Sequence, residues 1–350
     1  MKPLEVPIRV LVVDDSAANR RAITSLLEQT SDIVVIDRAE DGEAGLKKAL
    51  ELKPDVITLD LEMPRLDGFA FLRLLMSSTP TPVIVLSSYG HPSDVFKALQ
   101  LGAFDFVAKP AEGASIDSVR AELVQKIRAS RSAKKQLPPP RVTPPVHVPE
   151  TRRLDPQIPT LLIIGASTGG PPAVQKVLEA VSHLPVCALV AQHMPPRFTE
   201  AFAERLNQVV SMRVSEARSG DTPSAGHAFV APGGSHLEVV QSANGLSLVV
   251  SPPAPGDKHA PSVDRLFTSV AALKGVNAHA LVLTGMGSDG AVGVKALATS
   301  GIQVWVESEE SAVVFGMPHA AIATGKANHV LPLHELGPAL ARALRKAKDR

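Results

Sequence analysis

Residues 161–171 read LLIIGASTGGP, an apolar strand-like run followed by a glycine-rich turn and a proline at the start of a helix. The same succession of apolar run and helix-compatible segment returns at 187–192 (CALVAQ), 280–285 (ALVLTG) and 302–306 (IQVWV). Strands that alternate with helices are typical of a parallel sheet covered on both faces. Residues 160–350 are therefore predicted to form a doubly wound, mainly parallel α/β domain.

The pattern changes between residues 212 and 251. Four short apolar runs, MRVSEA, HAFVAP, HLEVV and LSLVV, are separated there by glycine, serine and proline. Short runs with turn residues between them are typical of hairpins. We expect an antiparallel excursion from the parallel sheet in this region.

A proline-rich segment precedes this domain. Eight of the thirty prolines lie in LPPPRVTPPVHVPETRRLDPQIP, at 137–159, where fixed φ angles and missing amide hydrogens oppose helices and ladders. Residues 131–159 are predicted to be a linker, and residues 1–130 a first α/β domain. Its expected strands are 8–13, 33–36, 56–60, 83–87 and 104–107, and its expected helices 17–29, 43–52, 67–76, 93–101 and 115–130.

Composition excludes several classes of protein. Of the 350 residues 45% are apolar and 20% charged, which suits two packed cores. The 36 basic residues nearly balance the 35 acidic ones, so we expect no nucleic-acid partner. Cys187 is the single cysteine and is predicted to be a buried thiol. The sequence has neither a membrane-spanning run nor a secretory signal at its start, MKPLEVP, so a cytoplasmic protein without membrane insertion is expected.

Polar side chains follow the expected strands of the first domain. Asp14 and Asp15 come after VLVV, Asp60 ends VITLD, and Ser87 and Lys109 end the fourth and fifth strands. Because parallel strands end at one edge of a sheet, these side chains are expected to meet there. Three carboxylates suit Mg²⁺, which prefers oxygen ligands. Asp60 would then accept a phosphoryl group that Lys109 and Ser87 bind.

Any one of these side chains alone would be explained as a helix cap facing water, whereas five together favour a site. Asp14-Asp15, LDLEMPRLDG (59–68) and FDFVAKP (104–110) resemble the response-regulator receiver family over residues 8 to about 128. The resemblance implies a flavodoxin-like (βα)5 fold and phosphorylation at Asp60. It also implies the backbone carbonyl of Glu62 as a metal ligand and Phe106 as an aromatic that repositions on phosphorylation.

Ser167 lies in Gly165-Ala166-Ser167-Thr168-Gly169, between a strand and a helix. The spacing matches the G-x-S-x-G nucleophile elbow, in which glycines permit a tight turn. A glycine-rich turn at a helix N-terminus is also compatible with nucleotide phosphate, although the P-loop lysine is absent and G-x-G-x-x-G does not fit. The motif alone leaves both interpretations open.

Two further strand ends favour hydrolysis. His193 follows CALVAQ and Asp289 follows ALVLTGMGS, so both are expected at the same sheet edge as Ser167. A single histidine at a strand end is more often structural, and the interpretation depends on the three residues together. His227, His236 and His259 are placed in loops that could line a cleft.

The order Ser, His, Asp differs from that of standard α/β-hydrolases. Instead IGASTGGP, AQHMPPRFTEAFAERLN, FVAPGGSHL, PSVDRLF and LTGMGSDGAVG resemble the catalytic domain of chemotaxis protein-glutamate methylesterases, the CheB-type enzymes, over residues 160 to about 345. The resemblance implies Ser167 as nucleophile, His193 as general base and acid, and Asp289 as the group that orients the imidazole. It adds the Met286 amide as an oxyanion donor and Thr168 as support.

The resemblance also implies a regulated activity. The enzyme would demethylate glutamate methyl esters, and deamidate glutamines, on the cytoplasmic region of chemoreceptors, with no cofactor for hydrolysis. A chemotaxis histidine kinase would donate the phosphoryl group, and phosphorylation would loosen a receiver packed over the catalytic edge.

Other classes of protein are also considered. About 190 residues of alternating α/β pattern, in a chain whose net charge is close to zero, do not resemble the small basic DNA-binding unit of a transcriptional regulator. A phosphorylation-gated binding module without activity, and the same hydrolase in another sensory pathway, remain alternatives.

Overall fold

The computed structural model describes residues 6–87, 92–109, 119–133 and 159–348. The chain divides into two compact units, Met1–Thr143 and Pro144–Arg350. Most of the predicted linker lies outside the described residues, so the proposed domain limits of 1–130, 131–159 and 160–350 remain predictions.

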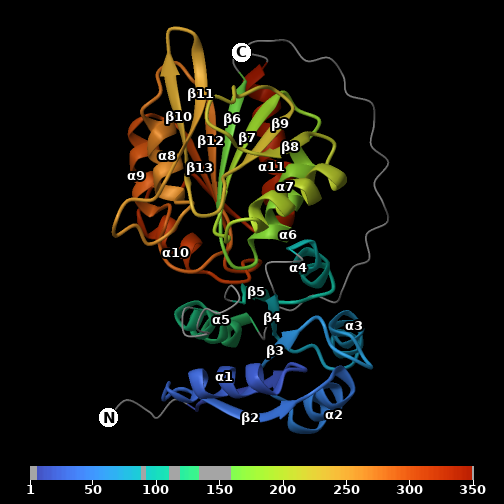
Figure 1. The fold of residues 1–350 in the computed structure, drawn as a ribbon. Coiled ribbons are helices and arrows are strands. Elements are labelled where there is room, and N and C mark those ends of the chain that lie inside the picture. The colour runs from blue at the N-terminus through green and yellow to red at the C-terminus, as the bar shows by residue number, and fades with distance from the viewer. Residues whose placement is uncertain (1–5, 88–91, 110–118, 134–158, 349–350) are drawn as a thin grey trace, which may run out of the picture. The chain divides into compact units, whose positions relative to one another are not determined.

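The first unit contains a five-stranded parallel sheet in the order β2-β1-β3-β4-β5. This is the flavodoxin-like order, so the predicted (βα)5 architecture is confirmed. Helices α1 and α5 contact each other, and α3 contacts both α2 and α4, as expected for a sheet with helices on both faces (Figure 1). The strands are β1 (Ile8–Val13), β2 (Ile33–Ala39), β3 (Val56–Asp60), β4 (Val83–Ser87) and β5 (Asp105–Ala108). The helices are α1 (Ala17–Glu28), α2 (Gly42–Leu52), α3 (Gly68–Ser78), α4 (Pro92–Gln100) and α5 (Arg120–Ala133).

Local sequence explains where three of these helices begin. Ser16, Asp41 and Asp67 are the N-caps of α1, α2 and α3. Each side chain accepts a hydrogen bond from the amide three residues later, which satisfies one of the free N–H groups of the first turn. The caps therefore fix where the chain turns from each strand end into the following helix.

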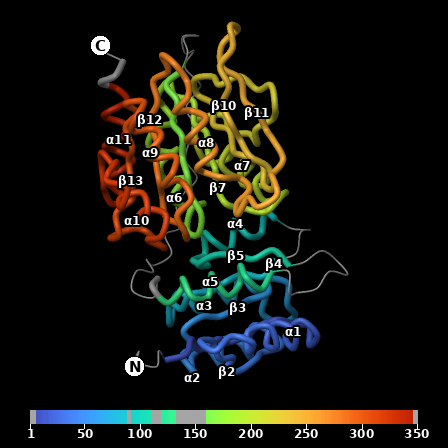
Figure 2. The backbone as a smooth tube through the Cα atoms, turned by 90° about the vertical axis from the view of Figure 1, so that its left-hand side faces the viewer, coloured from blue at the N-terminus to red at the C-terminus, as the bar shows by residue number. Residues whose placement is uncertain are grey.

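The second unit contains a seven-stranded sheet in the order β14-β13-β12-β6-β7-β9-β8, with every pair parallel. A separate antiparallel hairpin, β10–β11, lies beside α8 (Figure 2). The strands are β6 (Thr160–Ala166), β7 (Val186–Gln192), β8 (Arg213–Glu216), β9 (His227–Val230), β10 (His236–Ser242), β11 (Gly245–Ser251), β12 (Ala278–Val282), β13 (Gln303–Glu307) and β14 (His329–Leu331). The helices are α6 (Gly170–Val181), α7 (Phe198–Val209), α8 (Val263–Ala271), α9 (Ala291–Thr299), α10 (Met317–Ala323) and α11 (Leu333–Lys348).

The antiparallel excursion is confirmed for residues 236–251 but is shorter than the sequence suggested. MRVSEA and HAFVAP contribute β8 and β9, which run parallel within the main sheet. These two runs are short and flanked by turn residues, as the strands of a hairpin are. Whether a strand runs parallel or antiparallel depends on the strand with which it pairs, and a short run does not encode that partner. The three-residue strand β14 was not predicted.

The central strands β6, β7 and β12 are buried almost throughout, which explains their continuous apolar runs. Figure 1 shows α8 and α9 on one face of the sheet and α6, α7 and α11 on the other. Cys187 is fully buried as predicted, and burial raises the pKa of its thiol to about 12. Of the helices described, none is long and apolar enough to cross a membrane. All seven parallel strands end at one edge, which places their following loops together.

Candidate functional site

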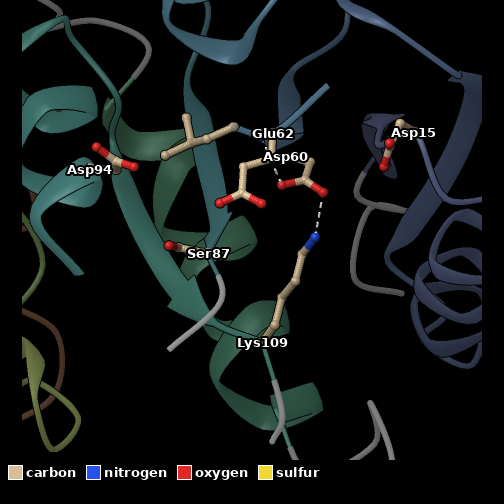
Figure 3. Close-up of a pocket in the computed structure, with 7 residues that line it drawn as sticks. Asp15, Asp60, Glu62, Ser87, Asp94 and Lys109 are labelled. Atoms are coloured by element: carbon tan, nitrogen blue, oxygen red, sulfur yellow. Dashed lines mark hydrogen bonds and ion pairs between the residues drawn. The ribbon is translucent and has the colours of Figure 1, made fainter. Parts of the chain in front are cut away.

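An acidic pocket lies at the carboxyl edge of the first sheet (Figure 3). Asp14 and Asp15 follow β1 and Asp60 is the last residue of β3. One carboxylate oxygen from each of these three residues lies within 4.8 Å of the other two. Asp14 is fully buried and Asp60 nearly so, whereas Asp15 is exposed. The donor set therefore consists of oxygens, as a hard divalent cation requires.

Lys109 supplies the positive charge nearest to this pocket. Its Nζ lies 2.5 Å from Asp60 Oδ2 and 3.2 Å from Asp14 Oδ2. Burial alone would lower the pKa of Lys109, but the carboxylates of Asp60 and Asp14 outweigh it and raise the pKa. Burial, opposed in part by Lys109 and assisted by Asp60, raises the pKa of Asp14. One ammonium thus pairs with two of the three carboxylates, and the remaining negative charge fits a bound cation.

Three other polar side chains line the same pocket: Glu62, Ser87 and Asp94 (Figure 3). The Glu62 amide donates to Asp60 Oδ1 at 3.3 Å, which holds the turn after β3 close to the phosphoacceptor candidate. Asp94, in the first turn of α4, was missed by the sequence analysis. An acid in the first turn of a helix is common for electrostatic reasons, so no sequence signal set it apart.

Phe106 is buried in β5. Lys126 of α5 donates a hydrogen bond to the Phe106 carbonyl, and its Nζ lies 5.1 Å from the centre of the ring. Lys126 is itself paired with Asp105 and Glu122. In this structure α5 therefore contacts both the backbone and the ring of the predicted switch residue.

In the second unit Ser167 follows β6 at the carboxyl edge. Its amide donates to the Thr284 carbonyl at 3.0 Å, and its carbonyl accepts from Gln192 Nε2 at 2.9 Å. Gly169 completes the turn with a φ of +75°, and a Cβ there would lie 2.6 Å from Val313 Cβ. Both the backbone conformation and the lack of space require glycine at this position.

His193 lies next to Ser167 at the end of the neighbouring strand. Ala166 pairs with Gln192 across β6 and β7, so Ser167 and His193 are the next residues on strands about 4.8 Å apart. His193 Nε2 lies 2.9 Å from Asp289 Oδ2, leaving Nδ1 as the ring nitrogen available to the serine. Ser167 Oγ makes no hydrogen bond in the described structure, and catalytic contacts are often long without substrate.

Asp289 is held by the start of α8. It accepts hydrogen bonds from the Val263 amide at 2.7 Å, the Asp264 amide at 2.9 Å and Ser262 Oγ at 3.1 Å. Burial alone would raise the pKa of Asp289, but the hydrogen bond and charge of His193, with these amides, hold it well below its usual range. Asp289 is therefore a fixed carboxylate that can stabilise an imidazolium.

The loop after β12 carries Gly285 and Met286 and passes close to Ser167. A Cβ on Gly285 would lie 2.7 Å from Ser167 Cβ, so glycine permits the close approach of this loop. Within the described residues the Met286 amide makes no hydrogen bond. A free amide close to a serine elbow suits an oxyanion donor.

Two supporting residues were missed by the sequence analysis. Thr284 Oγ1 donates to the Thr168 carbonyl and accepts from the Val314 amide, both at 2.9 Å. The Thr284 amide in turn donates to Glu307 Oε2 at 2.8 Å, and Glu307 is fully buried at the end of β13. A carboxylate at a strand end was the available signal for Glu307, as it was for Asp289.

Of the three other histidines, only His259 contacts the proposed catalytic residues, through a ring stack on His193. His227 does not lie in a loop: it is the first residue of β9, opposite Cys187, near the amino-terminal edge of the sheet. His236 also begins a strand, β10, and is fully buried. The expectation that all three occupy loops is therefore wrong for two of them.

Comparisons with known proteins agree with this division into two units. Residues 162–340 match the CheB methylesterase family and residues 10–119 match the response regulator receiver domain. The protein-glutamate methylesterase/protein-glutamine glutaminase 1 of Myxococcus xanthus is 53% identical, over 97% of this chain and 98% of its own. A protein of the same name, numbered 6, from Anaeromyxobacter dehalogenans is 49% identical over 97% of both chains. The crystal structure of the Thermotoga maritima CheB methylesterase catalytic domain is 31% identical, with a TM-score of 0.50, and covers 54% of this chain and 98% of its own.

Proposed function

The chain belongs to the CheB methylesterase family, and from that premise we propose that it is a phosphorylation-activated protein-glutamate methylesterase and protein-glutamine glutaminase. The observation that carries the proposal is the His193–Asp289 hydrogen bond beside the Ser167 elbow. A serine elbow with a paired imidazole and carboxylate performs acyl transfer in several unrelated folds.

The proposed reaction follows from this arrangement. His193 takes the proton of Ser167 as Oγ attacks the γ-carbonyl of a glutamate methyl ester, and the Met286 amide stabilises the oxyanion. The C–O bond to methoxide breaks, His193 protonates it, and methanol leaves. Water then attacks the acyl-enzyme, again with His193 as base, and releases glutamate and free Ser167. Thr168 supports the elbow through its carbonyl, which accepts from Thr284.

The glutaminase activity uses the same carbonyl. A glutamine side chain differs in its leaving group, which departs as ammonia after protonation by His193. An amide is the harder substrate, so we expect deamidation to be slower than demethylation at this site.

The first unit supplies the control. Asp60 accepts the phosphoryl group, and Lys109 and Ser87 bind its oxygens. Mg²⁺, when bound by Asp14, Asp15, Asp60 and the Glu62 backbone carbonyl, would neutralise charge that develops in phosphoryl transfer. Phe106 then changes position and shifts the population towards the active state.

The phosphodonor is a kinase and the substrate a chemoreceptor, so the activity contributes to sensory adaptation. More specifically, we propose a chemotaxis histidine kinase and the cytoplasmic region of a transmembrane receptor, which places the reaction in the cytoplasm. We propose that hydrolysis itself needs no cofactor, because serine, histidine and aspartate complete the acyl transfer.

The test is methanol release from methylated receptor cytoplasmic fragments, with and without a small-molecule phosphodonor. Wild type should release methanol faster with phosphodonor, and Ser167→Ala should lose about 10⁴-fold or more in kcat. Ser182→Ala removes a hydroxyl that bonds only the Glu179 carbonyl at the end of α6, and should behave as wild type. Absence of release from every variant would indicate a binding module that retains the fold.

A further inference from the structure

His259 covers one face of the proposed general base. The imidazole rings of His193 and His259 are stacked, with centroids 4.3 Å apart and an angle of 8° between their planes. His259 is an exposed residue, but the face of its ring that stacks on His193 is covered by that ring. The ring edge of His193 bonds Asp289, so two independent contacts restrain the same imidazole.

The loop that carries His259 is fixed at several points. His236 Nε2 lies 2.9 Å from Asp257 Oδ2, two residues before His259, and His236 Nδ1 accepts from the Ser262 amide at 3.2 Å. The Gly234 amide donates to the Ala260 carbonyl at 3.0 Å. A fully buried imidazole therefore joins both ends of the segment 257–262. These contacts fix the position of His259 although the residue is exposed.

The same segment continues into the support of the catalytic carboxylate. Ser262, where it ends, is the N-cap of α8 and donates through Oγ to Asp289. One continuous stretch of chain thus contacts the face of His193 and the carboxylate that orients it. A displacement of the segment would disturb both contacts together.

We propose that His259 is a positioning residue for the general base, whose uncharged ring fixes the plane of His193 and stabilises the imidazolium formed in catalysis. The inference rests on the proposed serine-hydrolase function. An aromatic face attracts a cation stacked on it, whereas a second positive charge at that distance repels one. His259 therefore acts as a stacking surface that must remain neutral.

The charges around His259 support a neutral ring. Partial burial of the ring, followed by the charge of His193, lowers its pKa below the ordinary value of 6.5. Asp289 opposes this shift and Lys258, on the same loop, adds to it. His193 and Asp289 approach from the loops after β7 and β12, so all three loops determine the charge state of the pair.

The experiment compares three replacements by their pH profiles of kcat/KM for ester hydrolysis. His259→Phe keeps a neutral aromatic face and should retain activity within about threefold. His259→Ala removes the face and should lose about tenfold, mainly in kcat. His259→Arg keeps a flat group but adds a permanent charge, so it should lose about 30-fold or more and move the acid limb to lower pH by about one unit.

Two controls make the outcome decisive. His334→Arg makes the same replacement at a side chain that is 68% exposed, and should match wild type. Equal losses of kcat/KM for His259→Phe and His259→Arg without movement of the acid limb would overturn the proposal in favour of simple packing.

If wild type itself shows no hydrolysis, the proposed function fails, and NMR titration still tests the interaction between His259 and His193. Replacing His193 with Gln should raise the pKa of His259, and an unchanged value would refute the coupling.

Discussion

His227 shows how burial changes a side chain far from the reacting groups. Its Nε2 lies 2.9 Å from Ser215 Oγ, and its ring centroid lies 3.8 Å from that of Phe229. Burial, with a smaller effect of Arg213, lowers the pKa of His227 from 6.5 to about 4. The folded state therefore holds the neutral imidazole over a range of pH in which the unfolded chain takes up a proton.

This difference predicts acid-sensitive stability of the second unit. Between these pH values the unfolded state binds one more proton than the folded state. The contribution of His227 to the free energy of unfolding is therefore complete above about pH 6.5 and is lost as pH falls towards 4. We expect a decrease of about 2 kcal/mol in the free energy of unfolding across that window. Trp305 is the only tryptophan and is buried in the second unit, so its fluorescence reports unfolding there. His227→Gln should flatten the dependence, and an equally steep curve in this variant would assign it to other groups.

At the scale of elements, the contact between β6 and α8 supports the site. Gly165 lies in β6 and Val263 begins α8, and a Cβ on Gly165 would lie 2.3 Å from Val263 Cγ1. The amide of that same Val263 donates to Asp289. The absence of a side chain at Gly165 is thus what lets α8 approach closely enough to hold the carboxylate.

A double-mutant cycle tests this contact. Gly165→Ala should lower the free energy of unfolding by about 2 kcal/mol through overpacking, and should lower kcat by displacing the start of α8. Val263→Ala should cost about 1–2 kcal/mol through lost burial. Because Val263→Ala makes room for the added methyl group of Gly165→Ala, the double variant should lose at least 1 kcal/mol less stability than the sum of the two single losses. Additive losses would mean that the two side chains do not share the space.

At the scale of the whole molecule, the two units divide the proposed chemistry between them. The carboxylate cluster and Lys109 lie in the first unit, and Ser167, His193 and Asp289 lie in the second. Each unit has its own sheet and core, so the two activities should be separable by single substitutions.

Asp60→Asn should therefore leave basal ester hydrolysis unchanged and abolish its increase with phosphodonor, because the amide cannot accept the phosphoryl group. Removing Mg²⁺ from wild type with a chelator should have the same effect, since the oxygen cluster is in the first unit. Both effects are measured as methanol release by wild type and Asp60→Asn, each with and without chelator. Activation that persists in Asp60→Asn would place the regulatory phosphoryl group elsewhere.

The sequence by itself determined the two α/β units and the strand ends that carry the polar groups. Continuous apolar runs mark strands buried on both faces, and parallel strands share a carboxyl edge, so Asp60 could be proposed from its position at a strand end and Ser167 from its position together with the G-x-S-x-G spacing. Resemblance to known families then supplied the proposed roles of Met286 and Phe106, which no local pattern encodes.

Other contacts between distant groups were decided only by the tertiary structure. It placed β8 and β9 parallel in the main sheet, and it brought His259 onto the face of His193 and Glu307 beneath Thr284. The physical reason is that strand direction, ring stacking and buried hydrogen bonds depend on partners far along the chain. A local sequence pattern records the burial of a residue but leaves open which other residue completes the contact.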